Sequence, residues 1–242
     1  MQRESAVSWS FREPANTGWA NGLGFVIDEK RHLALSSARW PLWRRAAKRV
    51  LDIGIASLSL LFLLPLLIII AVTIRTTSPG PALFVQWRPG RDGVMFPLLK
   101  FRTMHSRHCD PSGIDQAVRG DRRVTPFGAW LRRSSIDELP QLINVLMGHM
   151  ALVGPRPHPE GIRAAGLPYE DVVPCYRLRL GVRPGLSGWA QVNGYRGPTI
   201  DRVQAIARIE HDLAYMQNFS LLLDIRIILV TLVREFITGT GS

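Results

Sequence analysis

Residues 53–74 read IGIASLSLLFLLPLLIIIAVTI, a run of apolar and small side chains without a single charge. A helix made of this run is long enough to cross a bilayer, which takes about 20 apolar residues. A long helix on the surface of a soluble domain would normally keep a polar face, and this run has none. The run therefore predicts that the protein is associated with a membrane.

Pro65 lies near the middle of this run and complicates a simple crossing. Proline removes a helix hydrogen bond and bends the helix. Basic residues flank both ends, so the positive-inside rule gives no orientation for a single crossing. A helix that bends at Pro65 and returns to the same face would explain both features, and an ordinary kinked crossing stays open because proline is tolerated there. The flanking basic residues are Arg44, Arg45, Lys48 and Arg49 before the run, and Arg75, Arg88 and Arg91 after it.

The run divides the chain into three segments. Residues 1–42 show no clear periodicity and no apolar core of a signal peptide, so we expect a poorly ordered N-terminal tail. Residues 43–76 form the expected membrane helix, and residues 77–242 form the expected domain that follows it. Cys109 and Cys175 are far apart and imply no disulfide framework, which fits a domain in a reducing cytoplasm.

The net charge is +11, and nearly all of the basic residues are arginine. Arginine binds phosphate bidentately, so this composition suits nucleic acid, an anionic membrane or a phosphorylated small molecule. A GC-rich genome would produce the same bias. The basic residues are spread along the chain and no nucleic-acid-binding motif occurs, so we expect no nucleic-acid partner.

Outside the apolar run, the sequence predicts an α+β fold that is mostly helical. Two strands at 82–88 and 94–102 flank a Gly-rich turn and predict a small β-hairpin. Lys100 and Arg102 share one face of its second strand because side chains alternate. The charges that interrupt 221–237 favour a helix lying in the membrane interface over a core helix of the soluble domain. Other expected pieces are helices at 127–133, 139–146 and 201–217, and a short strand near 189–192.

The adjacent carboxylates Asp137 and Glu138 lie in the stretch SSIDELPQL at 134–142. Ser135-x-x-Glu138 matches a helix capping box, which is a purely structural explanation. A helix start is also an anion site, and it would lower the pKa of Asp137 and keep it ionised as a nucleophile. Glu138, together with Asp137, could hold a divalent cation, most simply Mg²⁺, that bridges phosphate oxygens.

Three arginines lie close to this carboxylate pair in the sequence. Arg132 and Arg133 precede the pair, and Arg156 stands between two prolines. All three could neutralise phosphate charge in a transition state. The prolines restrict the backbone and reduce the entropy cost of positioning Arg156, although a surface arginine in a rigid turn is the simpler alternative.

Six motifs occur in order over roughly residues 45–237, and together they resemble the bacterial sugar transferases, which are monotopic phosphoglycosyl transferases of polysaccharide assembly. The motifs are KRVLD at 48–52, SPGP at 78–81, KFRTM at 100–104, LRRSSIDELPQ at 131–141, VGPRP at 153–157 and GLSGWAQV at 185–192.

The resemblance implies a reaction and a set of roles. A UDP-sugar would give its sugar phosphate to undecaprenyl phosphate and release UMP. Asp137 would be the covalent nucleophile, Glu138 would help hold Mg²⁺, and Arg156 would contact the substrate phosphates. Helices of this family break at a proline and re-enter the membrane, which favours a hairpin at Pro65 and a catalytic domain on the cytoplasmic face of the bacterial inner membrane.

The remaining substrate contacts and partners are less determined. Lys100, Arg102, Arg132 and Arg133 are the other predicted substrate-binding cations. The sequence after Trp189 resembles members that start exopolysaccharides with glucose or galactose, so the expected donor is UDP-glucose or UDP-galactose. A homo-oligomer stays open. The alternatives are a membrane-tethered protein that binds anionic ligands and a non-catalytic partner of a polysaccharide assembly complex.

Overall fold

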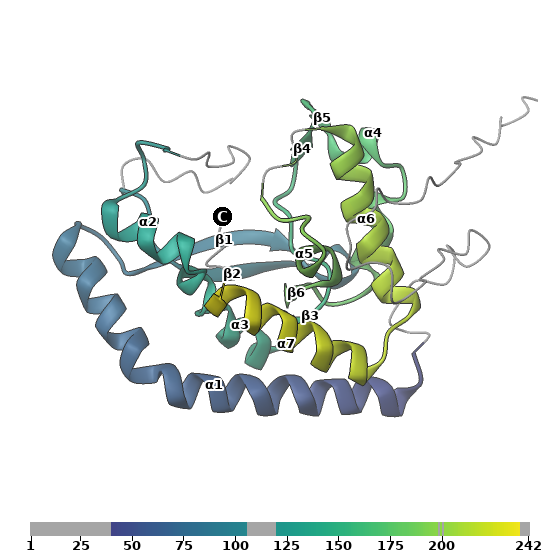
Figure 1. The fold of residues 1–242 in the computed structure, drawn as a ribbon, viewed down its shortest axis with the longest axis horizontal. Helices are drawn as coiled ribbons and strands as arrows, with labels where there is room; N and C mark the ends of the chain where they lie inside the picture. Colours follow the sequence, from purple (N-terminus) through teal and green to yellow (C-terminus); the bar gives the residue numbers. More distant parts are fainter. Residues whose placement is uncertain (1–39, 106–119, 198, 200, 238–242) are drawn as a thin grey trace, which may run out of the picture.

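The computed structural model describes residues 40–105, 120–197, 199 and 201–237 (Figure 1). The predicted tail at 1–42 therefore falls almost entirely outside the described residues. The helices are α1 (Leu42–Thr77), α2 (Pro126–Arg133), α3 (Gln141–Met147), α4 (Tyr169–Val172), α5 (Trp189–Val192), α6 (Arg202–Gln217) and α7 (Leu221–Ile237). The strands are β1 (Leu83–Pro89), β2 (Met95–Phe101), β3 (Ala151–Val153), β4 (Arg163–Ala164), β5 (Leu167–Pro168) and β6 (Gly185–Ser187). Short 3₁₀ helices lie at η4 (Arg91–Gly93), η6 (Ile136–Glu138) and η7 (Tyr176–Gly181).

The apolar run forms the second part of α1, a single helix of 36 residues with Pro65 inside it. Figure 1 shows α1 running along the base of the molecule and then turning towards β1. Pro65 thus lies within a bent helix and not in a non-helical break between two arms. A helix long and apolar enough to cross a membrane is present at the predicted place, whereas the two-armed hairpin is not confirmed.

Two parts of α1 are held against the rest of the protein, and an exposed elbow lies between them. Ala56 is fully buried in the main core, while Ile70 and Ile74 pack with Phe101 and Leu131 in a second, smaller cluster. Only 11% of the most apolar part of α1 is buried, so it is not the core helix of a soluble protein. The elbow exposes large apolar side chains at Leu58, Leu61, Phe62, Leu64, Leu66, Ile68, Ile69 and Val72.

Four buried polar side chains, which we call the junction cluster, fix the first part of α1 to α7. The cluster consists of Lys48, Asp52, Tyr215 and Asp224. The Nζ of Lys48 lies 2.7 Å from Asp224 Oδ2 and 3.6 Å from Asp52 Oδ1. The Tyr215 hydroxyl donates to Asp224 Oδ1 at 2.8 Å, and the Leu152 N–H donates to Asp52 at 3.1 Å. Every member therefore has a hydrogen-bonding partner.

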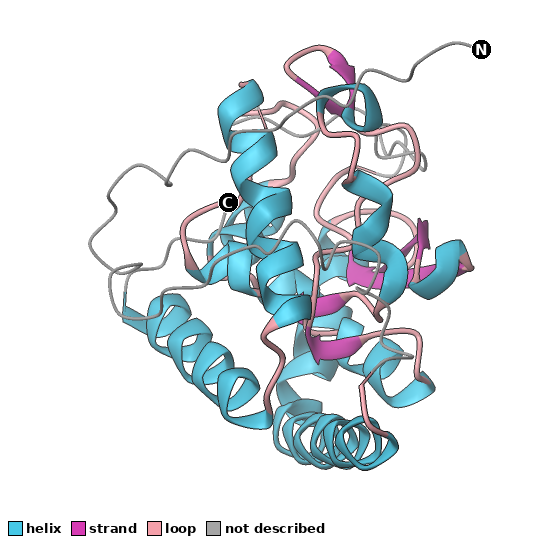
Figure 2. Ribbon diagram, turned by 90° about the vertical axis from the view of Figure 1, so that its right-hand side faces the viewer, coloured by secondary structure: helices cyan, strands magenta, loops and turns pink. Residues whose placement is uncertain are grey.

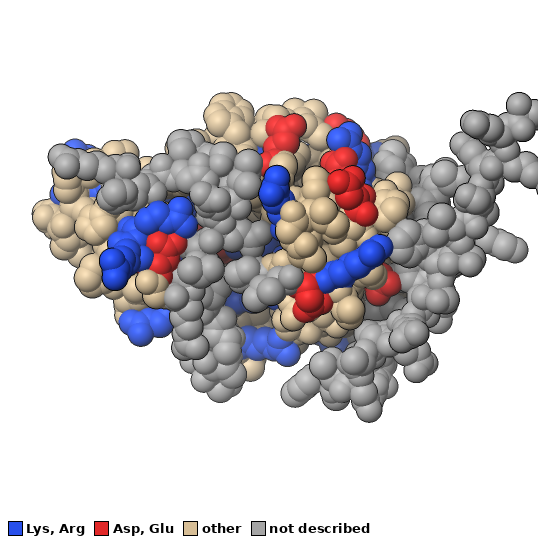
Figure 3. Space-filling view, turned by 90° about the horizontal axis from the view of Figure 1, so that it is seen from above, with Lys and Arg blue, Asp and Glu red and all other residues tan. Residues whose placement is uncertain are grey.

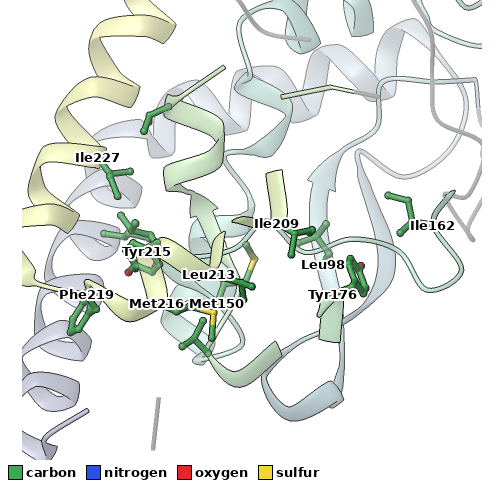
Figure 4. Packing of buried hydrophobic residues seen from close by; sticks show 14 of the residues in the cluster. Leu98, Met150, Ile162, Tyr176, Ile209, Leu213, Tyr215, Met216, Phe219 and Ile227 are labelled. Carbon is green, nitrogen blue, oxygen red and sulfur yellow. Dashed lines mark hydrogen bonds between the residues drawn. The ribbon is translucent and has the colours of Figure 1, made fainter. Parts of the chain in front are cut away.

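The predicted hairpin is confirmed: β1 and β2 pair antiparallel, with Leu83 opposite Phe101 and Pro89 opposite Met95. The predicted helices correspond to α2, α3, α6 and α7, so the mostly helical α+β class is also confirmed. Figure 2 shows short strands between the helices, and Figure 1 places β4 and β5 at the top of the molecule. The core is built chiefly where α6 meets the loops and β3, and it includes Met150, Leu213 and Tyr215 (Figure 4).

The predicted strand at 189–192 is wrong, because these residues form the helical turn α5. The strand is β6, which ends at Ser187 and pairs in parallel with β3. Gly188 then turns the chain in a place where a Cβ would lie 2.4 Å from the Gly154 carbonyl oxygen. This close approach requires glycine, and it places the residues after β3 beside those after β6.

Helix α7 has two apolar faces, which accounts for the ambiguity of its sequence. Leu223 and Ile227 are buried in the core, whereas Leu222, Leu229 and Leu232 are exposed. The helix is therefore both a core helix on one face and an apolar surface on the other, and Figure 1 places it alongside α1.

Candidate active site

A cleft rich in cations opens between the hairpin, α2 and the loops that follow β3 and β6. Cations outnumber acids strongly in its lining, so the cleft favours a ligand with several negative charges. Figure 3 shows that basic side chains gather on the upper face of the molecule, most densely at the α2 end. The charged lining residues are Arg88, Lys100, Arg102, Arg123, Arg132, Arg156, Arg196 and Arg208, with Glu138 and Asp212 as the acids.

The carboxylate pair follows a sharp reversal of the chain between α2 and η6. Ser135 adopts the left-handed conformation with φ 52° and makes no side-chain cap. An N-cap serine needs extended backbone, so the capping-box prediction is wrong. The strained turn instead carries Asp137 and Glu138 on a single 3₁₀ turn beside the cleft, and a non-glycine residue in this conformation is typical of functional sites.

Glu138 is held by Arg156 in a two-pronged ion pair. Arg156 donates from one nitrogen to Glu138 Oε2 at 3.0 Å and from the other to Oε1. Burial would raise the pKa of Glu138, but Arg156 outweighs this effect and holds the pKa below its usual range. Glu138 is therefore ionised at neutral pH, and its position is fixed by the arginine predicted to bind phosphate.

Asp137 differs from its neighbour because no hydrogen bond or ion pair to it is found among the described residues. It is only 9% exposed and lies beside the cleft lining. Burial and the charge of Glu138 raise its pKa to about 7, against the opposing effect of Lys100, Arg132 and Arg156. The predicted lowering of this pKa is wrong, because burial and the charge of Glu138 outweigh the nearby cations. A buried carboxylate without a hydrogen-bonding partner is a more reactive nucleophile than a solvated one.

Lys100 points into the cleft from β2. Its Nζ lies 3.4 Å from Gln86 Oε1 and 5.1 Å from the centre of the Phe84 ring. Burial and the nearby charge of Arg88 lower the pKa of Lys100 to about 8. Arg88, which the sequence analysis named only as a basic residue flanking the apolar run, reaches the same cleft from β1 and also bonds to Gln86.

Arg102 lines the cleft, but its guanidinium group also closes the C-terminal end of α1. It donates to the backbone oxygens of Pro79 at 2.8 Å and Ser78 at 2.7 Å, and to the Ser78 hydroxyl at 2.8 Å. These bonds tie the SPGP turn to the hairpin. The two cations predicted to share one strand face therefore differ in role: Lys100 faces the cleft, and Arg102 chiefly holds the turn after α1 to the hairpin.

The two adjacent arginines of α2 separate in space. Arg132 lines the cleft, whereas Arg133 is exposed and lies outside the lining. The reason is the helical repeat, which turns neighbouring side chains about 100° apart. The sequence therefore identified the right helix but could not tell which of its two arginines faces the substrate.

A buried ion pair that the sequence analysis missed supports Arg156. Arg179, in η7, contacts Asp212, in α6, at 2.7 and 3.0 Å, and it donates to the Arg156 carbonyl oxygen at 2.6 Å. Both side chains are nearly fully buried. Nothing in the sequence distinguishes Arg179 from its neighbours, because its partner lies 33 residues away.

The carboxylate pair fits Mg²⁺ by its chemistry. Magnesium is usually bound by one or two carboxylates together with substrate phosphates and water. Asp137 offers oxygens with no described partner, whereas each oxygen of the adjacent Glu138 also accepts from Arg156. No group of three His, Cys, Asp or Glu side chains that could hold a metal is found among the described residues, so any such site would need ligands from the substrate or water.

Comparisons with known proteins identify the family. Residues 43–238 match the family described as bacterial sugar transferase. The chain is 49% identical to an exopolysaccharide production protein of Rhizobium leguminosarum bv. phaseoli, over 80% of this chain and 97% of that protein.

Two longer relatives match the same region. One is the UDP-glucose:undecaprenyl-phosphate glucose-1-phosphate transferase of Escherichia coli, at 44% identity over 80% of this chain and 41% of the relative. The other is a UDP-N-acetylgalactosamine-undecaprenyl-phosphate N-acetylgalactosaminephosphotransferase of Aeromonas hydrophila, at 42% identity over 81% of this chain and 44% of the relative. The chain thus spans less than half the length of these two proteins. By the extent of the family match, this chain belongs to the bacterial sugar transferase family.

Proposed function

We propose that this protein transfers a sugar 1-phosphate from a UDP-sugar to undecaprenyl phosphate and releases UMP. The observation that carries this proposal is the buried Asp137 carboxylate, which has no described partner and lies among Lys100, Arg132 and Arg156. A nucleophile surrounded by cations suits attack on a diphosphate, whose own negative charge would otherwise repel a carboxylate. The relatives' names describe the same kind of transfer.

The reaction proceeds in two displacements. A carboxylate oxygen of Asp137 attacks the phosphorus that bears the sugar, and the bond from that phosphorus to the UMP oxygen breaks. An oxygen of undecaprenyl phosphate then attacks the phosphosugar on Asp137, which restores the carboxylate and forms the lipid diphosphate sugar. Arg156, Arg132 and Lys100 neutralise the phosphate oxygens during both steps. Mg²⁺, when held by Asp137 and Glu138, would supply further charge neutralisation on the diphosphate.

The sugar proposed is glucose or galactose. The Escherichia coli relative is named for glucose, and the Aeromonas hydrophila relative for N-acetylgalactosamine. The charged groups of the cleft lining are mainly cations, which suit the diphosphate and do not distinguish hexoses. We therefore infer a UDP-hexose donor and the first step of exopolysaccharide synthesis, in keeping with the exopolysaccharide relative from Rhizobium.

The apolar elbow of α1 supports a monotopic placement on the cytoplasmic side of the inner membrane. Both ends of α1 are fixed to one globular body, through the junction cluster at one end and through Ile70 and Ile74 at the other. A helix whose two ends meet the same domain enters and leaves on one face. The exposed apolar face of α7 would lie in the interface beside it.

The transfer is tested with the full chain in detergent or nanodiscs. With UDP-glucose labelled in the β-phosphate and no lipid acceptor, we expect labelled protein and one equivalent of UMP. Addition of undecaprenyl phosphate should discharge the label into lipid, and EDTA should prevent both steps. UMP release that needs the lipid acceptor and never labels the protein would contradict the covalent step. No UMP release from any UDP-sugar would favour an anionic-ligand-binding or non-catalytic role.

The placement of α1 is tested with single cysteines at Trp43 and Thr77, which are exposed at the two ends of the helix, in a chain without its native cysteines. Both should be protected from an impermeant thiol reagent in intact cells. Pro65→Leu should straighten the helix and expose the Trp43 site at least in part. Labelling of the Trp43 site in the chain that keeps Pro65 would show a true crossing.

A further inference from the structure

A buried glutamine in the cleft has an amide without any described partner. Gln191 is 3% exposed and belongs to the cleft lining. Neither its Nε2 nor its Oε1 has a hydrogen-bonding partner among the described residues. A buried donor and a buried acceptor that form no hydrogen bonds reduce the stability of the fold. Such an amide in a binding cleft therefore indicates a ligand that forms the missing hydrogen bonds.

The frame that carries Gln191 also carries Arg156. Strands β3 and β6 pair in parallel, and the Gly154 N–H donates to the Ser187 carbonyl oxygen at 2.9 Å. Arg156 follows β3 by three residues, and Gln191 follows β6 by four. Because the two backbones touch at Gly154 and Gly188, the distance between the phosphate-binding arginine and the amide is fixed by the fold.

His158 adds a second neutral group to the same lining. Its Nδ1 lies 3.2 Å from the Tyr176 hydroxyl, and its Nε2 has no described partner. We take the Tyr176 hydroxyl as the donor to His158 Nδ1, which places the ring proton of His158 on Nε2. Burial and the surrounding arginines keep the pKa of His158 well below its usual value, so the ring is neutral.

The cleft therefore holds two kinds of lining. Most of its charged groups are cations that suit phosphates, whereas Gln191 and His158 offer neutral donors and one acceptor. A diphosphate has no hydrogen to give to the Gln191 Oε1, because its oxygens only accept. The part of the donor that both accepts and donates along a flat edge is the uracil base, through its two carbonyl oxygens and its N3–H.

We propose that Gln191 recognises the imide edge of uracil, with Oε1 accepting from N3–H and Nε2 donating to a carbonyl oxygen, and that His158 Nε2 donates to the other carbonyl. This inference rests on the proposed function, since it takes the donor to be a UDP-sugar. It makes Gln191 a specificity-determining residue. The same amide turned towards the sugar hydroxyls is the competing arrangement.

The test combines one change in the protein with one change in the ligand. The affinity of each pair is measured by equilibrium binding in detergent, without turnover. UMP is compared with N3-methyl-UMP, in which the imide hydrogen is replaced. The protein with Gln191 should bind UMP about tenfold to a hundredfold more tightly than N3-methyl-UMP. Gln191→Met keeps the volume and removes the amide, so it should weaken UMP binding and reduce that ratio to near one. Gln191→Leu is the second variant if the first does not fold.

The matched control is Gln217→Met. Gln217 also has a side-chain nitrogen with no partner in the part of the chain that the structure describes, but it lies at the end of α6, outside the cleft lining. This variant should keep the full ratio between the two ligands. Thermal unfolding of all variants separates lost binding from lost fold.

The possible results separate this inference from the proposed function. UMP binding with no loss of the ratio in Gln191→Met would overturn the role of Gln191 and leave the transfer intact. A change in the rates with UDP-glucose relative to UDP-galactose, with an unchanged ratio for the two UMP ligands, would place the amide at the sugar and also overturn it. No UMP binding by the native chain would overturn the proposed uridine donor, and this inference with it.

Discussion

Two clusters with buried carboxylates, the junction cluster and the carboxylate pair beside the cleft, differ in what surrounds them. In the junction cluster, Asp52 and Asp224 share Lys48, and each also accepts a further hydrogen bond. In the cleft, Glu138 has Arg156, but Asp137 has no described hydrogen bond or ion pair. Burial raises the pKa of both junction carboxyls and of Asp137, so burial alone does not distinguish the two groups.

The difference lies in the partners, and it indicates which group serves stability and which serves chemistry. A satisfied buried network fixes one arrangement of its elements, here α1 against α7 and β3. A buried carboxylate without hydrogen-bonding partners lowers the stability of the fold. A protein keeps such a group where the group serves its function. The comparison therefore predicts opposite consequences for the same substitution in the two places.

The largest expected effect is on transfer by Asp137→Asn. The amide keeps the shape and removes the nucleophile, so transfer should fall by about a thousandfold or more. Asp224→Asn makes the same change in the junction cluster and should lower the melting temperature while leaving transfer within about tenfold of the native rate. Radiolabelled UDP-glucose turnover and thermal unfolding measure both. Near-normal turnover by Asp137→Asn would remove the nucleophile assignment.

The next effect is on stability, by Lys48→Met. The methionine fits the volume but leaves Asp52 and Asp224 without their cation, which should cost about 3–5 kcal/mol of unfolding free energy. Adding Asp224→Asn to Lys48→Met removes one of the two stranded charges and should recover part of the loss. Urea unfolding of the two variants gives the comparison. A loss below about 1 kcal/mol would show that the junction cluster does not hold α1 in place.

The sequence predicted the helices and strands better than the contacts between residues that lie far apart in the chain. The hairpin and the helices followed from alternation, turn residues and helical periodicity, and these signals are local. The capping box at Ser135 and Glu138 was wrong: Ser135 is left-handed, and Glu138 pairs with Arg156, 18 residues away. Local spacing could not show this pairing.

The junction cluster illustrates the same limit. Lys48 and Asp52 are spaced as helix neighbours and would pass for an ordinary surface pair. Their burial depends on Asp224, which lies 176 residues from Lys48. Likewise, the sequence found Asp137 and Arg156 by type and motif, but it could not find Arg179, Gln191 or His158, whose roles depend on burial and on partners from distant elements.

The pH dependence of rate and stability tests the environment of Asp137. Transfer needs the ionised carboxylate, so the rate should rise as pH increases through about 7, and it should fall above about 8 as Lys100 loses its charge. The folded pKa of Asp137 is raised above its unfolded value of 3.8, so native stability should decrease as pH rises from about 4 to 7. Asp137→Asn removes this loss and should therefore be the more stable protein at pH 8 but not at pH 4.

Rate profiles and urea unfolding across pH 4–9 check these two expectations separately. The matched variant is Asp224→Asn, in which the rising limb of the rate near pH 7 should be retained because Asp137 is untouched. A rising limb near pH 4 would show that Asp137 titrates as a solvated carboxyl. If the native chain were more stable than Asp137→Asn at pH 8, burial of the ionised Asp137 carboxylate would not be destabilising.

The smallest expected effect separates two neighbouring arginines at the edge of the cleft. Arg132 lines the cleft and acts on Asp137, whereas Arg133 is exposed. Arg132→Gln should reduce transfer by about tenfold, because one of several cations that neutralise the diphosphate is lost. Arg133→Gln, on the same helical turn, should change transfer by less than about twofold. Equal losses of transfer in both variants would mean that α2 contributes only a general positive field. The substrate would then be attracted by the charge of the whole basic surface, and direct contacts inside the cleft would not distinguish Arg132 from Arg133.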